Sequence, residues 1–262
     1  MDAVAAPSTR AEPPAWRLAL ESLRRPYPLS VGTAVPIVAL MLLVPLYIVI
    51  GELMPGRAVH APELALDTLV PLEPAWALVY GALYLFLILL PVFVVRREAQ
   101  IRRTAYAYLF VWITAYVCFL AYPTVAPRPA AVAGTGFAAW GLRFLYGADP
   151  PFNCFPSLHV AHSFVSAFAV GRVHRGLGRV AAACAGVVGI STLFTKQHYA
   201  ADVVAGLLLA CVAWLLFLRR DAAGAVPDAD RRAAPALAAG ILGILILVAA
   251  CCWVAYEVGG HA

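Results

Sequence analysis

Hydrophobic residues along this chain fall in long runs, and short stretches that contain arginine, proline and acidic residues separate them. Each run is roughly 17–22 residues long, the length that crosses a bilayer as a helix. The pattern predicts an all-α fold: a polytopic membrane bundle with a six-helix core and a seventh, C-terminal transmembrane helix. The runs lie near residues 31–51, 75–95, 104–122, 157–173, 180–197, 199–218 and 236–256.

The same pattern divides the chain into four segments. Residues 1–30 form a cytoplasmic N-terminal segment, in which Ala15–Arg25 has the spacing of an amphipathic helix on the membrane surface. Residues 31–218 form the six-helix membrane domain that carries the candidate chemistry. Residues 219–235 form a charged cytoplasmic linker, and residues 236–262 hold the additional helix and the tail, which we expect to lie outside the catalytic core.

Positive charge is distributed unequally between the two sides of the predicted membrane. With the N-terminus in the cytoplasm, the inside segments carry 15 of the 19 lysines and arginines, a strong positive-inside bias. The outside segments carry only Arg57, Arg128, Arg143 and Lys196. This orientation places two histidine-containing segments at the outer, extracytoplasmic side.

Composition excludes several classes of protein. The chain is 63% hydrophobic and 13% charged, with a mean hydropathy of +0.84, which is typical of a multi-spanning membrane protein rather than a soluble domain. We therefore expect a multi-pass protein of a cell membrane, such as a bacterial inner membrane. The arginines are dispersed between apolar runs, so the net charge of +5 predicts no nucleic-acid partner. Five of six cysteines fall inside apolar runs, and we interpret Cys154 as a packing residue too.

Two segments combine histidine with other polar residues at the ends of apolar runs. In the first, Pro156 and Ser157 precede His159 at a predicted helix start, where free N–H groups favour a bound phosphate. In the second, His198 and Asp202 are four residues apart and so share a helical face. The carboxylate can hold one ring nitrogen as N–H and leave the other nitrogen able to attack an electrophile.

Cations near these segments are candidates for binding phosphate. Lys196 is the only lysine of the chain, and it lies two residues before His198. Arg128 follows the third run, and Arg143 is a weaker candidate in the same outer loop. The outer loops 52–74 and 123–153 are long enough to form a cap and an interfacial lid over such a site.

The motifs resemble those of the type 2 phosphatidic acid phosphatase superfamily over roughly residues 65–218. Arg128-Pro129 matches the end of the first signature, although Ala121 stands at its lysine position. Pro156-Ser157-Leu158-His159 matches the second with Leu for Gly. Ser191-Thr192, His198 and Asp202 match the third with Thr for Arg. The Phe-Pro-Ser-Leu-His and Lys-Gln-His-Tyr variants resemble the branch that includes inositol phosphorylceramide synthases.

The resemblance implies a metal-independent lipid phosphatase that acts on a lipid phosphate or pyrophosphate and needs no cofactor. His198 would be the nucleophile, Asp202 would orient it, and His159 would protonate the leaving oxygen. Phosphate oxygens would bind Arg128, Lys196 and Ser157, with Arg143 in a weaker role. One turn after Thr192, Lys196 would replace the arginine of the signature. The related alternative is a phosphotransferase that passes a phospho-headgroup from one lipid to another.

Two interpretations from other classes stay open at this stage. Histidine and aspartate are zinc ligands, so His159, His162, His198 and Asp202 could instead form the site of a metal-dependent membrane hydrolase. A lipid-phosphate carrier would use the same basic pocket without chemistry, but it would leave the His–Asp pair unexplained. Chelation tests the first of these alternatives, and turnover of a lipid phosphate tests the second.

Overall fold

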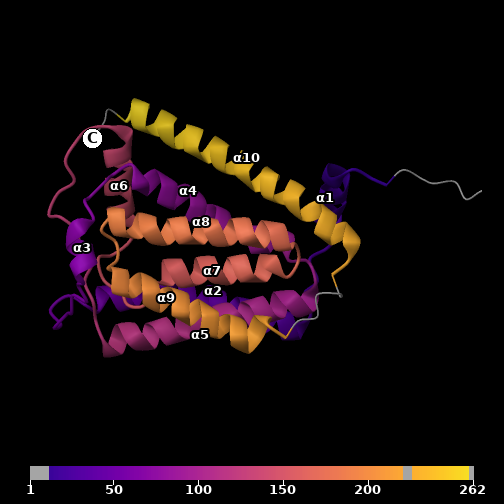
Figure 1. The fold of residues 1–262 in the computed structure, drawn as a ribbon, viewed down its shortest axis with the longest axis horizontal. Coiled ribbons are helices and arrows are strands. Elements are labelled where there is room, and N and C mark those ends of the chain that lie inside the picture. Colours follow the sequence, from indigo (N-terminus) through magenta and orange to yellow (C-terminus); the bar gives the residue numbers. More distant parts are fainter. Residues whose placement is uncertain (1–11, 221–225, 260–262) are drawn as a thin grey trace, which may run out of the picture.

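The computed structural model describes residues 12–220 and 226–259. Those residues form ten α-helices and one π-helical turn, with two isolated β-bridges as the only extended pairing among them. The prediction of an all-α membrane bundle is confirmed (Figure 1). The helices are α1 (Ala15–Arg24), α2 (Val31–Glu52), α3 (Ala65–Leu69), α4 (Trp76–Val94), α5 (Glu98–Ala121), α6 (Phe137–Ala148), α7 (Leu158–Gly171), α8 (Arg175–Phe194), α9 (Ala200–Ala213) and α10 (Asp228–Val258), and the π-helical turn η1 (Trp214–Leu218) continues α9.

Six helical segments of the described chain are long and apolar enough to cross a membrane: α2, α4, α5, α8, α9 together with η1, and α10. The run expected near 157–173 is the exception, because α7 has only 14 residues. It packs against α4, α5, α8 and α9 and lies among neighbouring helices in Figure 1. Nine of its residues are buried, so most of α7 contacts protein rather than lipid and does not need the full bilayer length.

Glycines allow α7 to approach its neighbours closely. A Cβ on Gly178 of α8 would lie 2.3 Å from the Cα of Gly171, and a Cβ on Gly206 of α9 would lie 2.5 Å from the carbonyl oxygen of Ser157. Both distances are shorter than a real Cβ contact, so these positions require glycine. The second contact fixes the start of α7 against α9, and each of these two helices begins beside a histidine.

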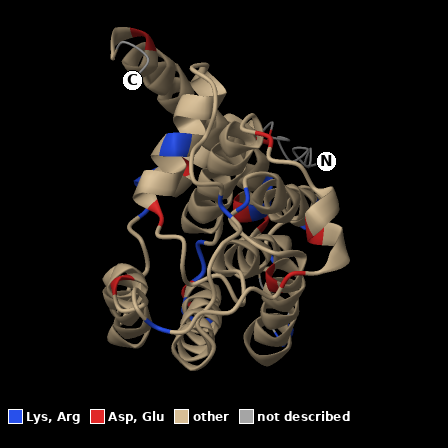
Figure 2. Ribbon diagram, turned by 90° about the vertical axis from the view of Figure 1, so that its left-hand side faces the viewer, with Lys and Arg blue, Asp and Glu red and all other residues tan. Residues whose placement is uncertain are grey.

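The two ends of the bundle differ in what covers them. α3, α6 and the long loops lie at one end, whereas α1 lies at the other (Figure 1). α7 and α9 both begin at the end with α3 and α6, which we call the histidine end. Most arginines follow or precede helices at the opposite end, which we call the arginine end. Figure 2 views the histidine end and shows that charged residues occupy only short stretches of an otherwise uncharged ribbon.

The last helix begins earlier than the hydrophobic pattern predicts. α10 starts at Asp228 rather than near 236, so the second half of the predicted 219–235 linker is helical. Asp228 and Asp230 lie in its first turn, where negative charge complements the helix dipole. Asp230 also forms an ion pair with Arg25, just after α1. Polar residues can therefore begin a membrane helix when a neighbouring helix supplies their partners.

α10 runs diagonally along the bundle and packs against α1 and α4 (Figure 1). At its far end the Tyr256 hydroxyl donates to the carbonyl oxygen of Thr135 over 2.8 Å. The Tyr256 ring also packs against Phe137 and Trp140 of α6. α10 thus supports α6, which lies next to the candidate site.

Candidate active site

The two histidines that the sequence singles out meet at the histidine end. Nδ1 of His159 lies 3.1 Å from Nε2 of His198, although 39 residues separate them along the chain. Nδ1 of His198 faces Oδ2 of Asp202 at 3.4 Å, which is long for a hydrogen bond. The three side chains form one continuous row, Asp202–His198–His159, and both Asp202 and His198 are buried.

Local backbone contacts hold this row in place. The amide of Ser157 donates to the carbonyl oxygen of Asp202 over 3.0 Å and so joins the start of α7 to α9. The Ser157 hydroxyl accepts from the amide of Val160 at 3.3 Å and caps α7. Ser157 is fully buried in this arrangement. Its side chain therefore serves first as a helix cap, and a phosphate would have to compete with the Val160 amide for it.

Asp202 is fixed by the first turn of α9. Its Oδ2 accepts a 2.9 Å hydrogen bond from the amide of Tyr199 in addition to facing His198. Oδ1 is buried and has no partner in the described part of the chain. A buried carboxylate that is positioned from its own helix start can orient the imidazole and stabilise positive charge on it.

Aromatic rings surround the outer histidine. The rings of Tyr80 and Tyr84 from α4 meet His159 edge-on, with centroid distances of 5.3 and 5.0 Å. Tyr84 also contacts His162, and Tyr108 of α5 stacks on His162 at 4.2 Å. His162 thus has aromatic partners of its own, and the hydrogen-bond contacts of the row join His159, His198 and Asp202 without it.

Arg128 lies next to the site but is bound to its own loops. Its guanidinium donates to the carbonyl oxygens of Asp149 (2.7 Å), Tyr146 (3.3 Å) and Pro150 (3.4 Å), and to Oε1 of Gln197. It also stacks on the Tyr146 ring, 4.5 Å from the centroid. Arg128 therefore ties the 146–150 segment to the residue that precedes the nucleophile candidate.

Sequence reasoning missed a buried carboxyl group beside Arg128. Oδ2 of Asp149 lies 3.6 Å from the guanidinium, and its Oδ1 accepts a 2.8 Å hydrogen bond from the Tyr47 hydroxyl of α2. Burial raises the pKa of Asp149, and the Tyr47 hydrogen bond and the positive charge of Arg128 only partly oppose this effect. A lone aspartate at the end of a loop helix carries no sequence signal for such a role.

Lys196 is likewise held by backbone carbonyls. It adopts φ = 53°, a left-handed conformation that is uncommon for residues other than glycine, in the short connection between α8 and α9. Its Nζ donates to the carbonyl oxygens of Val70 (2.5 Å) and Asp67 (3.2 Å). Asp67 is buried, and its Oδ1 accepts from the amide of Ala200 at 2.8 Å. The 52–74 loop thus covers this connection, and sequence reasoning missed Asp67 as its anchor.

Among the described residues, the remaining positions make no side-chain hydrogen bond to the row. Arg143 of α6 donates to the carbonyl oxygen of Gly134 at 2.8 Å, and among the described residues no hydrogen bond or ion pair links it to the histidines. Thr192, at the arginine position of the third signature, is buried and donates to the carbonyl oxygen of Gly189 at 2.7 Å. Ala121 is the last residue of α5. Neither Thr192 nor Ala121 supplies a cation.

One group of side chains has the composition of a metal site. Ligand atoms of Cys154, His198 and Asp202 lie within 4.8 Å of one another, and all three residues are buried. Burial raises the pKa of the Cys154 thiol well above its ordinary range, and Asp202 adds to this effect. The Cys154 thiol donates to the carbonyl oxygen of Pro151 over 3.6 Å, a contact that suits the packing residue expected from the sequence. His159 and His162 are not part of this group.

Comparison with known proteins covers the region that builds the site. A family model described as the PAP2 superfamily matches residues 60–216, which include Arg128, both histidine segments and Asp202. No curated protein and no solved structure matches the chain. Because the matched region makes up more than half of the chain and includes the whole Asp202–His198–His159 row, the chain belongs to the PAP2 superfamily.

Proposed function

We propose that this protein is a lipid phosphatase that removes phosphate from a lipid phosphate or pyrophosphate through a phosphohistidine intermediate. One observation carries the proposal: the row in which Asp202 faces one nitrogen of His198 and His159 faces the other. This is the arrangement that an oriented nucleophile and a proton donor require. Membership of the PAP2 superfamily supports phosphatase-type lipid chemistry in general.

In the first step the nitrogen of His198 that carries the lone pair attacks the phosphate. Asp202 holds Nδ1 of His198 as N–H, so Nε2 carries the lone pair. Nε2 attacks phosphorus in line, the N–P bond forms, and the bond from phosphorus to the lipid oxygen breaks. His159, whose Nδ1 lies 3.1 Å from Nε2, gives its proton to that leaving oxygen. The two rings must separate as the phosphoryl group enters between them.

The second step returns the enzyme to its starting state. His159, now without the transferred proton, accepts one from a water molecule, and the hydroxide formed attacks the phosphohistidine. The N–P bond breaks, inorganic phosphate leaves, and Nε2 of His198 regains its lone pair. Throughout, Asp202 stabilises the positive charge that develops on the His198 ring.

Arg128 and Lys196 would bind the phosphoryl oxygens. Both cations donate mainly to neutral acceptors, and a phosphate dianion is a stronger acceptor for them. We therefore propose that substrate draws them away from their carbonyl partners. This exchange also loosens the 52–74 and 146–150 segments over the row, which lets a headgroup enter.

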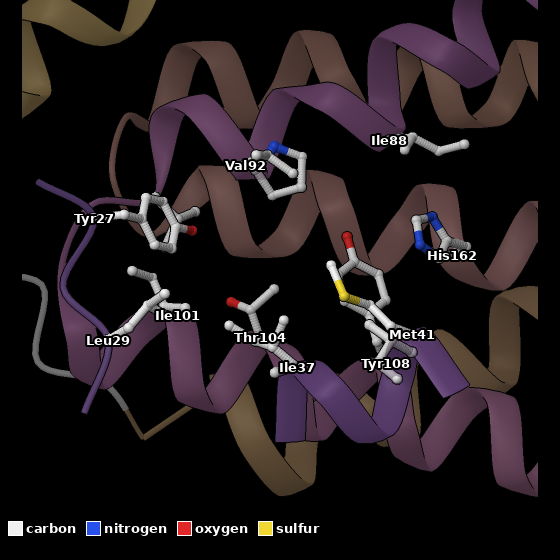
Figure 3. Close-up of a pocket in the computed structure, with 14 residues that line it drawn as sticks. Tyr27, Leu29, Ile37, Met41, Ile88, Val92, Ile101, Thr104, Tyr108 and His162 are labelled. Carbon is white, nitrogen blue, oxygen red and sulfur yellow. The ribbon is translucent and has the colours of Figure 1, made fainter. Parts of the chain in front are cut away.

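An apolar pocket supports a lipid rather than a soluble substrate. It has a volume of about 490 Å³ and lies between α2, α4, α5 and α7. Figure 3 shows His162 and Tyr27 at its opposite ends, with Ile101 beside Tyr27 and the side chains of Ile37 and Val92 between the two ends. His162 is one helical turn from His159, so a hydrocarbon chain in this pocket would belong to a molecule whose headgroup is near the row.

The outward orientation of the site is also part of the proposal. It rests on the positive-inside bias, because the arginine end would face the cytoplasm. In a background that lacks the native cysteines, Ala130→Cys should react with an impermeant thiol reagent in intact cells. Gly176→Cys should react only after permeabilisation. The reverse pattern would move the substrate to the inner leaflet.

Phosphotransfer is the alternative, and the burial of His198 under two loops favours it. A site that excludes water would pass its phosphoryl group or phospho-headgroup to an acceptor hydroxyl instead. Purified protein with phosphatidate in detergent micelles and excess chelator distinguishes the possibilities. We expect release of inorganic phosphate without added metal. Phosphate that appears only on an added alcohol would establish a transferase, and activity that is lost on chelation and restored by zinc would establish a metal enzyme. No turnover at all of phosphatidate or a polyprenyl pyrophosphate would favour a carrier.

A further inference from the structure

A second cavity lies at the arginine end, on the opposite side of the bundle from the histidine row. It has a volume of about 480 Å³ and forms where α7 ends and α8 begins, beside η1. Three arginines, Arg172, Arg175 and Arg179, line it, and no carboxylate among the described residues does. The proposed phosphatase chemistry uses none of these residues, so the cavity needs a separate explanation.

The three arginines have no counter-charge within the described chain. None of them forms an ion pair or a side-chain hydrogen bond there, and Nε of Arg172 is buried without any partner. Arg175 and Arg179 lie in the first two turns of α8, whose first turn contains no acidic residue. The positive end of the helix dipole therefore adds to the positive charge of the side chains. Such an arrangement favours an anion.

The walls of the cavity are apolar and belong to membrane helices. Phe168 of α7 and Trp214 of η1 lie side by side, with ring centroids 6.3 Å apart, and Ala167 and Ala182 complete the wall. Tryptophan is the side chain that typically lies at the boundary between lipid headgroups and hydrocarbon. The cavity thus combines a cationic rim with a lipid-compatible floor.

The α7–α8 hairpin brings the three arginines together. Gly171 and Gly178 approach so closely that a Cβ on Gly178 would clash with the Gly171 backbone. Arg172 directly follows Gly171, and Arg175 and Arg179 lie on either side of Gly178 along the chain. This close contact therefore holds all three arginines around the cavity that they line.

We propose that this cavity binds the phosphate of an anionic phospholipid from the leaflet at the arginine end. The arginines donate to the phosphate oxygens, for which guanidinium geometry is well suited. The lipid chains lie along Phe168 and Trp214. A soluble phosphate would gain nothing from the aromatic wall, and a zwitterionic lipid would bring a positive group toward three arginines. An anionic membrane lipid satisfies both halves of the cavity.

Native mass spectrometry of the purified full-length protein with equal amounts of phosphatidylglycerol and phosphatidylcholine tests the proposal. Arg175→Gln/Arg179→Gln removes two rim charges and leaves the partly buried Arg172 in place. Arg24→Gln/Arg102→Gln removes two charges from other segments at the same end and is the matched control. Gel filtration and phosphatase activity report folding for both variants. We expect the rim variant to lose the preference for phosphatidylglycerol by about tenfold or more, and the control to keep it.

A second measurement places the lipid next to Trp214. Because Trp16 and Trp253 are exposed as well, the measurement uses a variant in which Trp214 is the sole tryptophan. Phosphatidylglycerol with brominated chains should quench its fluorescence, and Arg175→Gln/Arg179→Gln in the same background should remove most of that quenching. Glycerol phosphate at excess should not displace the lipid. Equal loss of preference in the rim and control variants would overturn the proposal, because the effect would then be bulk charge. Displacement by glycerol phosphate would overturn the lipid assignment.

Discussion

The charged groups at the two ends of the bundle differ in whether other residues of the described chain bind them. At the histidine end, Arg128 and Lys196 are held by backbone carbonyls and an amide, and Asp202 is fixed by the start of its own helix. At the arginine end, the three arginines around the α7–α8 connection have no partner in the described chain. A reactive site needs groups with one defined geometry, whereas a headgroup site needs only accessible charge. α7 connects the two ends.

The largest effect should come from removing His198, the proposed nucleophile at the histidine end. His198→Ala should reduce kcat for lipid-phosphate hydrolysis by more than about a thousandfold, or ~4 kcal/mol, because His198 is the histidine of the row whose ring faces a carboxylate, that of Asp202. The protein should remain folded by circular dichroism. His60→Ala changes a histidine of the outer loop outside the row and should keep activity near that of the wild type. A residual activity above a tenth in His198→Ala would exclude covalent catalysis by this residue.

Substitutions of Lys196 test whether the cations that backbone carbonyls hold leave those partners to bind the substrate. Lys196→Ala should lower kcat/KM by about 2–4 kcal/mol, as for one lost donor to transition-state charge. Lys196→Arg should restore part of the loss, since it retains the charge. If Lys196 served only to tie Val70 and Asp67, the alanine variant would lose thermal stability and keep kcat/KM within about threefold.

Disturbing the close packing between α7 and α9 should have a smaller effect. Gly206→Ala adds a methyl group 2.5 Å from the Ser157 carbonyl oxygen and should move α7 from α9, at a cost of about 1–3 kcal/mol in stability. Activity should fall with it, because His159 and His198 move apart. Gly186→Ala on α8 meets no atom within 4 Å and is the control. Equal melting temperatures and activities for both variants would show that this contact does not position the row.

The smallest effect concerns Asp149 and appears in the pH dependence of stability. Burial raises the pKa of Asp149 in the fold, so the folded protein binds this proton more tightly than the unfolded chain does. That contribution is complete below the ordinary aspartate pKa of about 3.9 and is lost as the pH rises through the folded value. The melting temperature of the wild type relative to Asp149→Asn should therefore fall between pH 4 and pH 7. A difference that grows with pH would show that the Arg128 ion pair outweighs burial.

Local spacing explains which parts of this account could be read from the sequence. The apolar runs predicted the membrane helices, because a bilayer imposes their length. His198 and Asp202 were recognisable because four residues make one helical turn. In contrast, the carbonyl partners of Lys196 lie about 126 residues away, and those of Arg128 depend on how the 146–150 loop folds back. α10 begins at Asp228 rather than near 236, and Asp230 in its first turn forms an ion pair with Arg25. This contact joins distant segments, and no local pattern encodes it.

The central claim is that His198 accepts the phosphoryl group, and trapping the intermediate tests it most directly. Purified wild-type protein is mixed with a radiolabelled lipid phosphate and quenched in alkali within one turnover, and the labelled peptide is then sequenced by mass spectrometry. The account predicts an acid-labile phosphoryl group on His198, which Asp202→Asn reduces and His198→Ala abolishes. Turnover without any labelled protein, or a label on another residue such as His159, would contradict it.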